Sequence, residues 1–389
     1  MRRLAVASAL MFLSLCPLAA QEIEKPWEDW EPPVTEALVP NAFDIYLKAF
    51  DLLEELGEPE RDADSEQVRA ALEEHALTFR LLEEAMMGDC LLPAVTSLDQ
   101  PLPHLRGFRS SARLFVARAN LRVEEGRYAE AALDCIACVR LGADAARGGP
   151  LIAGLVGIAC EAIGLHALQD IIPGVQPDDC RIAIAALRAA EAEHVPLAQV
   201  LEAEAIASKG NMKQMFAQQT LQMAENIKTL GVAEEEIARM LEDWQPAHSW
   251  HAFDKFFEAV IEQAHKPYWD RDEVPKPGDQ LVDTIVPVYA RTGFKFALAD
   301  ARLRLALVHL ATQAYLLDKG LPPADLEALV PEYLDMIPDD PFADATLRSA
   351  TRDGDFVIYS VGPDGADDGG TEIDGIPEPD SMGDIVVTP

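Results

Sequence analysis

Apolar residues recur every three or four positions through most of the chain, which is the spacing of amphipathic helices. The periodicity predicts helices over residues 33–57, 65–88, 105–125, 128–141, 151–172, 182–193, 196–230, 233–244, 250–266 and 287–319. Ser65 is the expected N-cap of the second of these helices. The run from Leu151 to Ile172 is nearly all apolar, so we expect a helix buried at the centre of the protein.

The pattern changes after Gly320, where prolines become frequent. Residues 324–330 predict one short helix. Residues 347–351 and 356–361 alternate around Arg352-Asp353-Gly354, which is typical of a β-hairpin, and residues 385–387 predict a last short strand. The predicted fold class is therefore mostly α: a large body of helical bundles and hairpins, followed by a small α+β module with a short antiparallel sheet.

The N-terminus predicts export. Arg2 and Arg3 precede an apolar stretch, Leu4 to Leu15, that is short for a membrane span, and small residues follow it. We expect a signal peptide over 1–20, a linker over 21–33, a helical domain over 34–267, a second linker over 268–287, and a long helix with the α+β module over 288–389. The expected location is periplasmic or extracellular, with no stable membrane span once the signal is removed. A retained anchor and lipidation at Cys16 remain alternatives.

Composition narrows the function classes. The formal net charge of −35 repels phosphate backbones, so we expect no nucleic-acid partner. Five cysteines would remain after removal of the signal: Cys90, Cys135, Cys138, Cys160 and Cys180. An odd number in an exported protein leaves at least one thiol free or paired between molecules. Their apolar helical context favours small buried side chains, and one disulfide stays open as an alternative.

The loop from Tyr359 to Gly370 is rich in aspartate and glycine. Ca²⁺ prefers carboxylate and carbonyl oxygens, and glycine lets the backbone turn sharply enough to direct carbonyls inward. The loop does not have the spacing of an EF-hand. A solvated acidic turn is the alternative interpretation.

The chain from Ala301 to Asp384 resembles the periplasmic part of the type II secretion major pseudopilin. The resemblance rests on four segments in order: residues 314–322 at the end of the long helix, Leu326 to Val330, Tyr333 to Phe342, and Tyr359 to Gly370 with Asp384-Ile385. It implies a Ca²⁺ ion that orders the C-terminal segment, with Asp364 and Asp384 as ligands. Asp367 belongs to the same loop and is a third candidate ligand, and backbone carbonyls near Leu347 and Val361 would complete the shell.

The chain departs from that family in front of the long helix. In that family a peptidase site of the Gly-Phe type stands before an apolar membrane helix. Here Gly293-Phe294 lies deep in the chain, and the charged residues Lys295, Asp300 and Arg302 follow it. A helix with these charges does not suit a pilus core, so the resemblance implies the fold and ion of the module and not assembly into a pseudopilus.

No catalytic motif is recognisable in the sequence. Cys135 and Cys138 have redox spacing but fall in the middle of a predicted helix, where core packing is favoured. His248 and His251, with Glu258 and Glu262 downstream, form a weak candidate for metal binding or proton transfer.

Two hypotheses follow for function. The first is an exported, non-catalytic protein with a helical scaffold, a calcium-stabilised module and a protein partner in the cell envelope or a secretion assembly. The second is a periplasmic enzyme with a site in a cleft between helical body and module, around His248 to Trp269. A concave cleft with converging His, Glu and Asp side chains would favour the second hypothesis.

Overall fold

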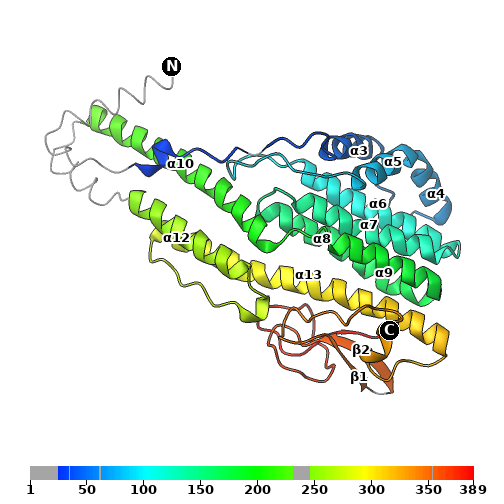
Figure 1. Cartoon of the computed structure of the whole chain (residues 1–389). Helices are drawn as coiled ribbons and strands as arrows, with labels where there is room; N and C mark the ends of the chain where they lie inside the picture. Colours follow the sequence, from blue (N-terminus) through cyan, green and yellow to red (C-terminus); the bar gives the residue numbers. More distant parts are fainter. Residues whose placement is uncertain (1–24, 35, 61–62, 231–245, 353) are drawn as a thin grey trace.

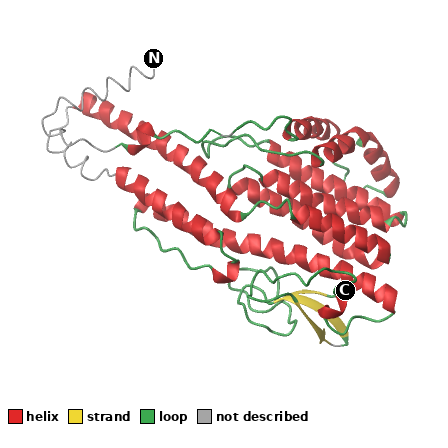
Figure 2. Cartoon of the chain, in the orientation of Figure 1, coloured by secondary structure: helices red, strands yellow, loops and turns green. Residues whose placement is uncertain are grey.

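The protein is a bundle of helices with one small sheet packed against the side of its longest helix (Figures 1 and 2). The computed structural model describes residues 25–34, 36–60, 63–230, 246–352 and 354–389. It is 61% helical and has one three-stranded antiparallel sheet, which confirms the predicted fold class. The predicted signal peptide and the predicted helix 233–244 lie outside the described residues.

The described helices fall into a body and a protruding pair. The body contains α3 (Phe43–Leu56), α4 (Ser65–Glu74), α5 (Ala76–Met86), α6 (His104–Glu124), α7 (Tyr128–Ala146), α8 (Leu151–Ile171), η1 (Ile172–Gly174) and α9 (Pro177–Glu191). The protruding pair is α10 (Leu197–Leu230) and α12 (Pro246–Ala264), with the short α2 (Pro26–Asp29) beside it (Figure 1). The turn η2 (Tyr268–Asp270) then leads to α13 (Gln280–Lys319).

Side-chain caps decide several boundaries that periodicity alone misplaced. The expected N-cap Ser65 is the first residue of α4, and Asp64 caps the helix in a reciprocal pair of hydrogen bonds with Gln67. The single helix predicted over 65–88 is two helices. They are separated at His75, which is buried with its Nε2 atom 2.8 Å from the carbonyl of Gly57.

The long C-terminal helix also begins earlier than expected, at Gln280 and not at Pro287. The carboxylate of Asp279 accepts hydrogen bonds from the backbone N–H groups of Leu281 (3.0 Å) and Val282 (3.1 Å), which satisfies donors that a helix start leaves free. The second part of the predicted linker 268–287 is therefore helical.

Helix α8 lies inside the body, as its apolar sequence predicted. It contacts α6, α7, α10 and α13. Gly142 of α7 and Gly157 of α8 let two helix backbones approach closely, since a Cβ atom on Gly142 would lie 2.6 Å from the Gly157 carbonyl oxygen. The segment Leu151–Gly174 is also long and apolar enough to cross a membrane by length and composition, but its packing is that of a core helix.

Helix α13 joins the body to the α+β module. One side of it contacts α8 and α9, and the other contacts the sheet (Figure 1). The sheet has the order β1 (Arg348–Arg352), β2 (Asp355–Ser360) and β3 (Ile385–Val387), and η3 (Leu326–Leu329) replaces the short helix predicted over 324–330. A single apolar cluster runs from Leu168 through Leu307 to Ile358, so body and module share one core.

Candidate functional site

A cleft of about 670 Å³ lies between part of the helical body and the α+β module. Its walls come from α7, α8, the α9–α10 connection, the end of α12 with η2, α13, and residues 339–345 of the module. The body side is lined partly by Gly142, Gly154 and Gly157, whose missing side chains leave room beside the helices. Long-range packing forms this cleft, because its walls come from segments that are far apart in the sequence.

Three titratable side chains converge in the cleft. His194, in the α9–α10 connection, has Nε2 3.2 Å from Oε1 of Glu161 on α8. Its other ring nitrogen, Nδ1, lies 3.6 Å from Oδ1 of Asp300 on α13. The connection that carries His194 is itself anchored, because the carboxylate of the adjacent Glu193 pairs with Arg140 and Arg147 of α7.

The protonation of His194 follows from these neighbours. Burial by itself would lower the pKa of the imidazole, but Asp300 and Glu161 stabilise the charged form and raise the pKa of His194 to about 10. His194 is therefore an imidazolium at neutral pH, a hydrogen-bond donor and not a general base.

Glu161 is a buried carboxylate in a mostly apolar helix. It is only 6% exposed, and its Oε2 atom has no hydrogen-bond partner among the described residues. A buried carboxylate oxygen without a donor costs free energy, so a hydrogen-bond donor brought to this atom would be stabilising.

Most cationic groups of the cleft have partners already. Arg271 donates from Nε to the carbonyl of Lys266 at 3.0 Å, close to the C-terminal end of α12. Lys266 pairs with Asp272 at 3.1 Å, and Arg304 donates from Nη1 to the carbonyl of Asp339 at 2.9 Å. These cations hold the walls together.

The acidic loop predicted to bind calcium is organised by Asp384. This residue is fully buried, and its Oδ2 atom accepts hydrogen bonds from the backbone N–H groups of Gly370 (2.6 Å) and Thr371 (3.1 Å). Its Oδ1 atom has a longer contact, 3.4 Å, with the N–H of Asp368. Burial raises the pKa of Asp384. The carboxylate thus ties the tail before β3 to the loop.

The other two predicted ligands have different surroundings. Asp364 accepts from the N–H of Ala366 at 3.0 Å, and its second oxygen lies 3.4 Å from the N–H of Gly383, next to Asp384. Asp367 pairs with the guanidinium of Arg348 and accepts from the hydroxyl of Tyr359 at 3.0 Å.

The donor chemistry of Asp364 and Asp384 therefore fits a hard cation, since each keeps one oxygen with only a long contact. Asp367 does not fit, because the Arg348 guanidinium would repel the cation. Among the described residues, no group of three or more His, Cys, Asp or Glu side chains could hold a metal ion.

Asp340 is a structural carboxylate that sequence reasoning left without a role. It is 2% exposed and accepts hydrogen bonds from Ser360 Oγ (2.7 Å) and from the backbone N–H of Val361 (2.8 Å). It connects the proline-rich segment to the end of β2. A signal was present, since Asp339-Asp340 falls between two prolines in the segment that carries the family resemblance.

The cleft suggested around His248 to Trp269 is only partly where the sequence placed it. Residues 264–269 line the cleft described above, together with Arg271. His248 lines a separate hollow with Ser249 and Asp279, near the start of α13. Sequence reasoning missed Glu161, His194 and Asp300. Glu161 alone had a signal, as a carboxylate in the middle of the apolar run 151–172.

The five cysteines are buried free thiols. Burial raises the pKa of Cys135 and of Cys160 to about 12, so both are protonated and unreactive at neutral pH. Cys138 donates to the Ala112 carbonyl at 3.5 Å, within the α6–α7 interface. The Cys135–Cys138 pair therefore belongs to the core.

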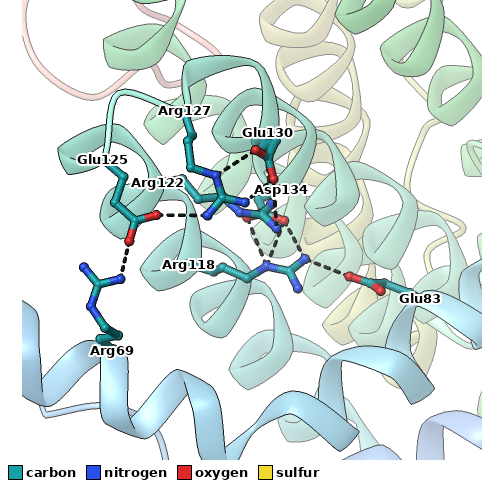
Figure 3. A network of polar contacts seen from close by, with 8 residues as sticks. All are labelled: Arg69, Glu83, Arg118, Arg122, Glu125, Arg127, Glu130 and Asp134. Atoms are coloured by element: carbon teal, nitrogen blue, oxygen red, sulfur yellow. Dashed lines mark hydrogen bonds and ion pairs between the residues drawn. The ribbon is translucent and has the colours of Figure 1, made fainter.

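A second polar cluster lies away from the cleft and fixes the α6–α7 hairpin (Figure 3). The buried carboxylate of Asp134 forms ion pairs with Arg118 at 2.6 Å and with Arg122 at 2.5 Å. Arg118 also lies over the ring of Phe79, 3.8 Å from its centroid, and reaches Glu83 at 2.9 Å. These groups are mutually satisfied, so the cluster is structural.

No protein-family model matches the chain, and neither the curated proteins nor the solved structures contain a significant match to it.

Proposed function

We propose that this chain is an exported binding protein that holds a small ligand in the cleft between its helical body and its α+β module. The observation that carries the proposal is the convergence of Glu161, His194 and Asp300 in a cleft of about 670 Å³. A concave site of this volume with a few convergent polar groups is typical of small-molecule binding.

Binding is favoured over covalent catalysis by the chemistry of the walls. No Ser, Thr or Cys is among the described residues that line the cleft. His194 is charged and has a carboxylate near each ring nitrogen, so it suits orientation of a ligand better than proton abstraction.

An enzyme acting in the same cleft is the second candidate. The observation that favours it is the convergence of His194, Glu161 and Asp300, the arrangement that the sequence hypotheses assigned to an enzyme. An imidazolium held between two carboxylates can donate a proton to a bound substrate. The two candidates differ in turnover: an enzyme would convert the ligand that the cleft retains.

Two further proposals concern the rest of the chain. The N-terminal sequence supports export to the periplasm or beyond, where a protein of the cell envelope would be the partner. The resemblance to the major pseudopilin and the oxygens of Asp364 and Asp384 support a bound Ca²⁺ ion that would join the acidic loop to the tail.

The binding function is tested with a variant that fills the cleft. Ala345→Trp adds a large side chain to the lining, and Ala324→Trp adds the same side chain at an exposed position of the module. The purified proteins are screened for thermal stabilisation by a metabolite library, and small molecules released on denaturation are identified by mass spectrometry.

We expect ligands that stabilise the parent protein and Ala324→Trp but not Ala345→Trp. If no compound separates the two variants, the cleft is not a binding site. Conversion of a retained compound by the parent protein would establish the enzyme.

A further inference from the structure

Acidic side chains outnumber basic ones in the lining of the cleft. Six carboxylates line it, against three permanent cations and the imidazolium of His194. The carboxylates are Glu161, Glu191, Asp300, Asp339, Asp340 and Asp344. A ligand that enters therefore meets a local excess of negative charge.

The cations already face carboxylates or carbonyl groups, so an anionic ligand would have to compete for them. Nε2 of His194 has no hydrogen-bond partner among the described residues, but it lies 3.2 Å from Oε1 of Glu161, whose carboxylate would repel an anion. Lys266 and Arg304 are paired with Asp272 and Glu191, respectively. Arg271 has one unpartnered nitrogen, Nη1, but it lies against Gly293 of α13, where a Cβ atom would be only 2.9 Å away. That nitrogen faces the helix and leaves little room for a ligand.

The acceptors are in the opposite situation. Oε2 of the buried Glu161 has no hydrogen-bond partner in the described part of the chain. On the module side, Asp339 and Asp344 are exposed along the cleft. Hydrogen-bond acceptors on both sides of the cleft favour a ligand that has N–H donors.

An aromatic side chain stands beside these acceptors. Trp269, in η2, lines the cleft and keeps 42% of its surface exposed, although a large apolar ring gains free energy from burial. The face of an indole ring attracts cations, and a cation between carboxylates and an indole gains from both.

We infer that the ligand of this cleft is an organic cation, a primary amine or guanidinium compound with an apolar stem. This inference rests on the proposed function. The charged head would donate to Glu161 Oε2, the stem would cover Trp269, and a second amine on a longer ligand would reach Asp339 and Asp344.

Spermidine and lysine amide serve as probes. Fully N-acetylated spermidine is the uncharged control for spermidine. Binding is measured by calorimetry in 150 mM KCl, and the tryptophan fluorescence of the parent protein is compared with that of Trp269→Phe. We expect micromolar binding of spermidine, at least tenfold weaker binding of the acetylated compound, and a fluorescence change that Trp269→Phe lacks.

A protein of net charge −35 attracts any cation. The control variant must therefore lose the same number of negative charges as the cleft variant. Asp339→Asn/Asp344→Asn removes two carboxylates from the cleft. Asp355→Asn/Asp374→Asn removes two exposed carboxylates that do not line it. We expect about a tenfold loss of affinity in the first variant and unchanged affinity in the second.

Equal weakening in both double variants would mean non-specific attraction only and would overturn the inference. Absence of spermidine and lysine amide binding, with anionic or neutral compounds stabilising the parent protein but not Ala345→Trp, would refute the cationic ligand while leaving the binding function intact. If Ala345→Trp blocks no ligand of any charge, the binding function itself fails.

Discussion

Nε2 of His194 lies 3.2 Å from Oε1 of Glu161, and this contact joins the α9–α10 connection to the middle of the central helix α8. Asp300 approaches the other side of the same imidazole from α13. One protonated ring therefore connects three segments that meet at the cleft. The stability of the fold and the shape of the cleft should both depend on its charge.

Replacement of His194 by Gln should change how stability depends on pH. The folded-state pKa of about 10 is above the ordinary value of 6.5, so the folded protein binds the proton more tightly than the unfolded chain does. The stabilisation is complete below about pH 6.5 and is lost as the pH rises towards 10.

At pH 6 the His194→Gln variant should lose about 3 kcal/mol, as expected when one member of a buried pair is removed. The difference from the parent protein should shrink at pH 10. Urea unfolding at several pH values measures it, and a difference that stays constant between pH 6 and 10 would contradict the assignment.

His309 should affect the pH dependence of stability in the opposite direction to His194. It is 3% exposed in α13, neither ring nitrogen has a hydrogen-bond partner among the described residues, and burial lowers its pKa to about 4. The unfolded chain therefore binds the proton more tightly, and stability is lost as the pH falls from about 6.5 to 4.

The His309→Leu variant should lose this acid sensitivity and gain about 1–3 kcal/mol at pH 5, because an unpaired polar group leaves the core. Thermal melting from pH 4 to 7 provides the comparison. An unchanged acid slope in the variant would show that other groups cause the sensitivity.

The Asp134 cluster offers a test of the α6–α7 hairpin. Asp134→Ala leaves Arg118 and Arg122 without their buried partner and should cost about 3–5 kcal/mol. Glu130→Ala, which removes an exposed carboxylate of the same cluster, should have little effect. Guanidinium denaturation distinguishes them, and similar losses in the two variants would refute the dominant role of Asp134.

Calcium should stabilise the module if Asp364 and Asp384 bind it. At a hundredfold excess over its dissociation constant, Ca²⁺ should add about 2.7 kcal/mol of stability, and a chelator should remove the gain. Asp364→Ala should abolish the response, because it removes a proposed ligand of the ion. The variant should still fold, because that carboxylate has few structural contacts. Asp374→Ala is the exposed control. Melting curves that do not respond to calcium, or that respond equally in Asp364→Ala, would exclude the site.

Local sequence patterns predicted most elements of the fold but not all of their ends. The α6–α7 hairpin, α8 and the β1–β2 hairpin follow from spacing and turn residues, which act over a few positions. The start of α13 was missed because one carboxylate, Asp279, caps the helix ahead of Pro287. The break at His75 was missed because its partner is the distant carbonyl of Gly57.

The sequence by itself determined the helical class, the late change to an α+β module and the acidic loop, because each is written in neighbouring residues. Only the tertiary structure decided that Glu161, His194 and Asp300 meet, since α8, the α9–α10 connection and α13 come together through packing around a shared core. It also gave Asp367 a cationic partner, Arg348. Contacts of this kind depend on long-range geometry. For that reason the cleft could not be predicted from the sequence.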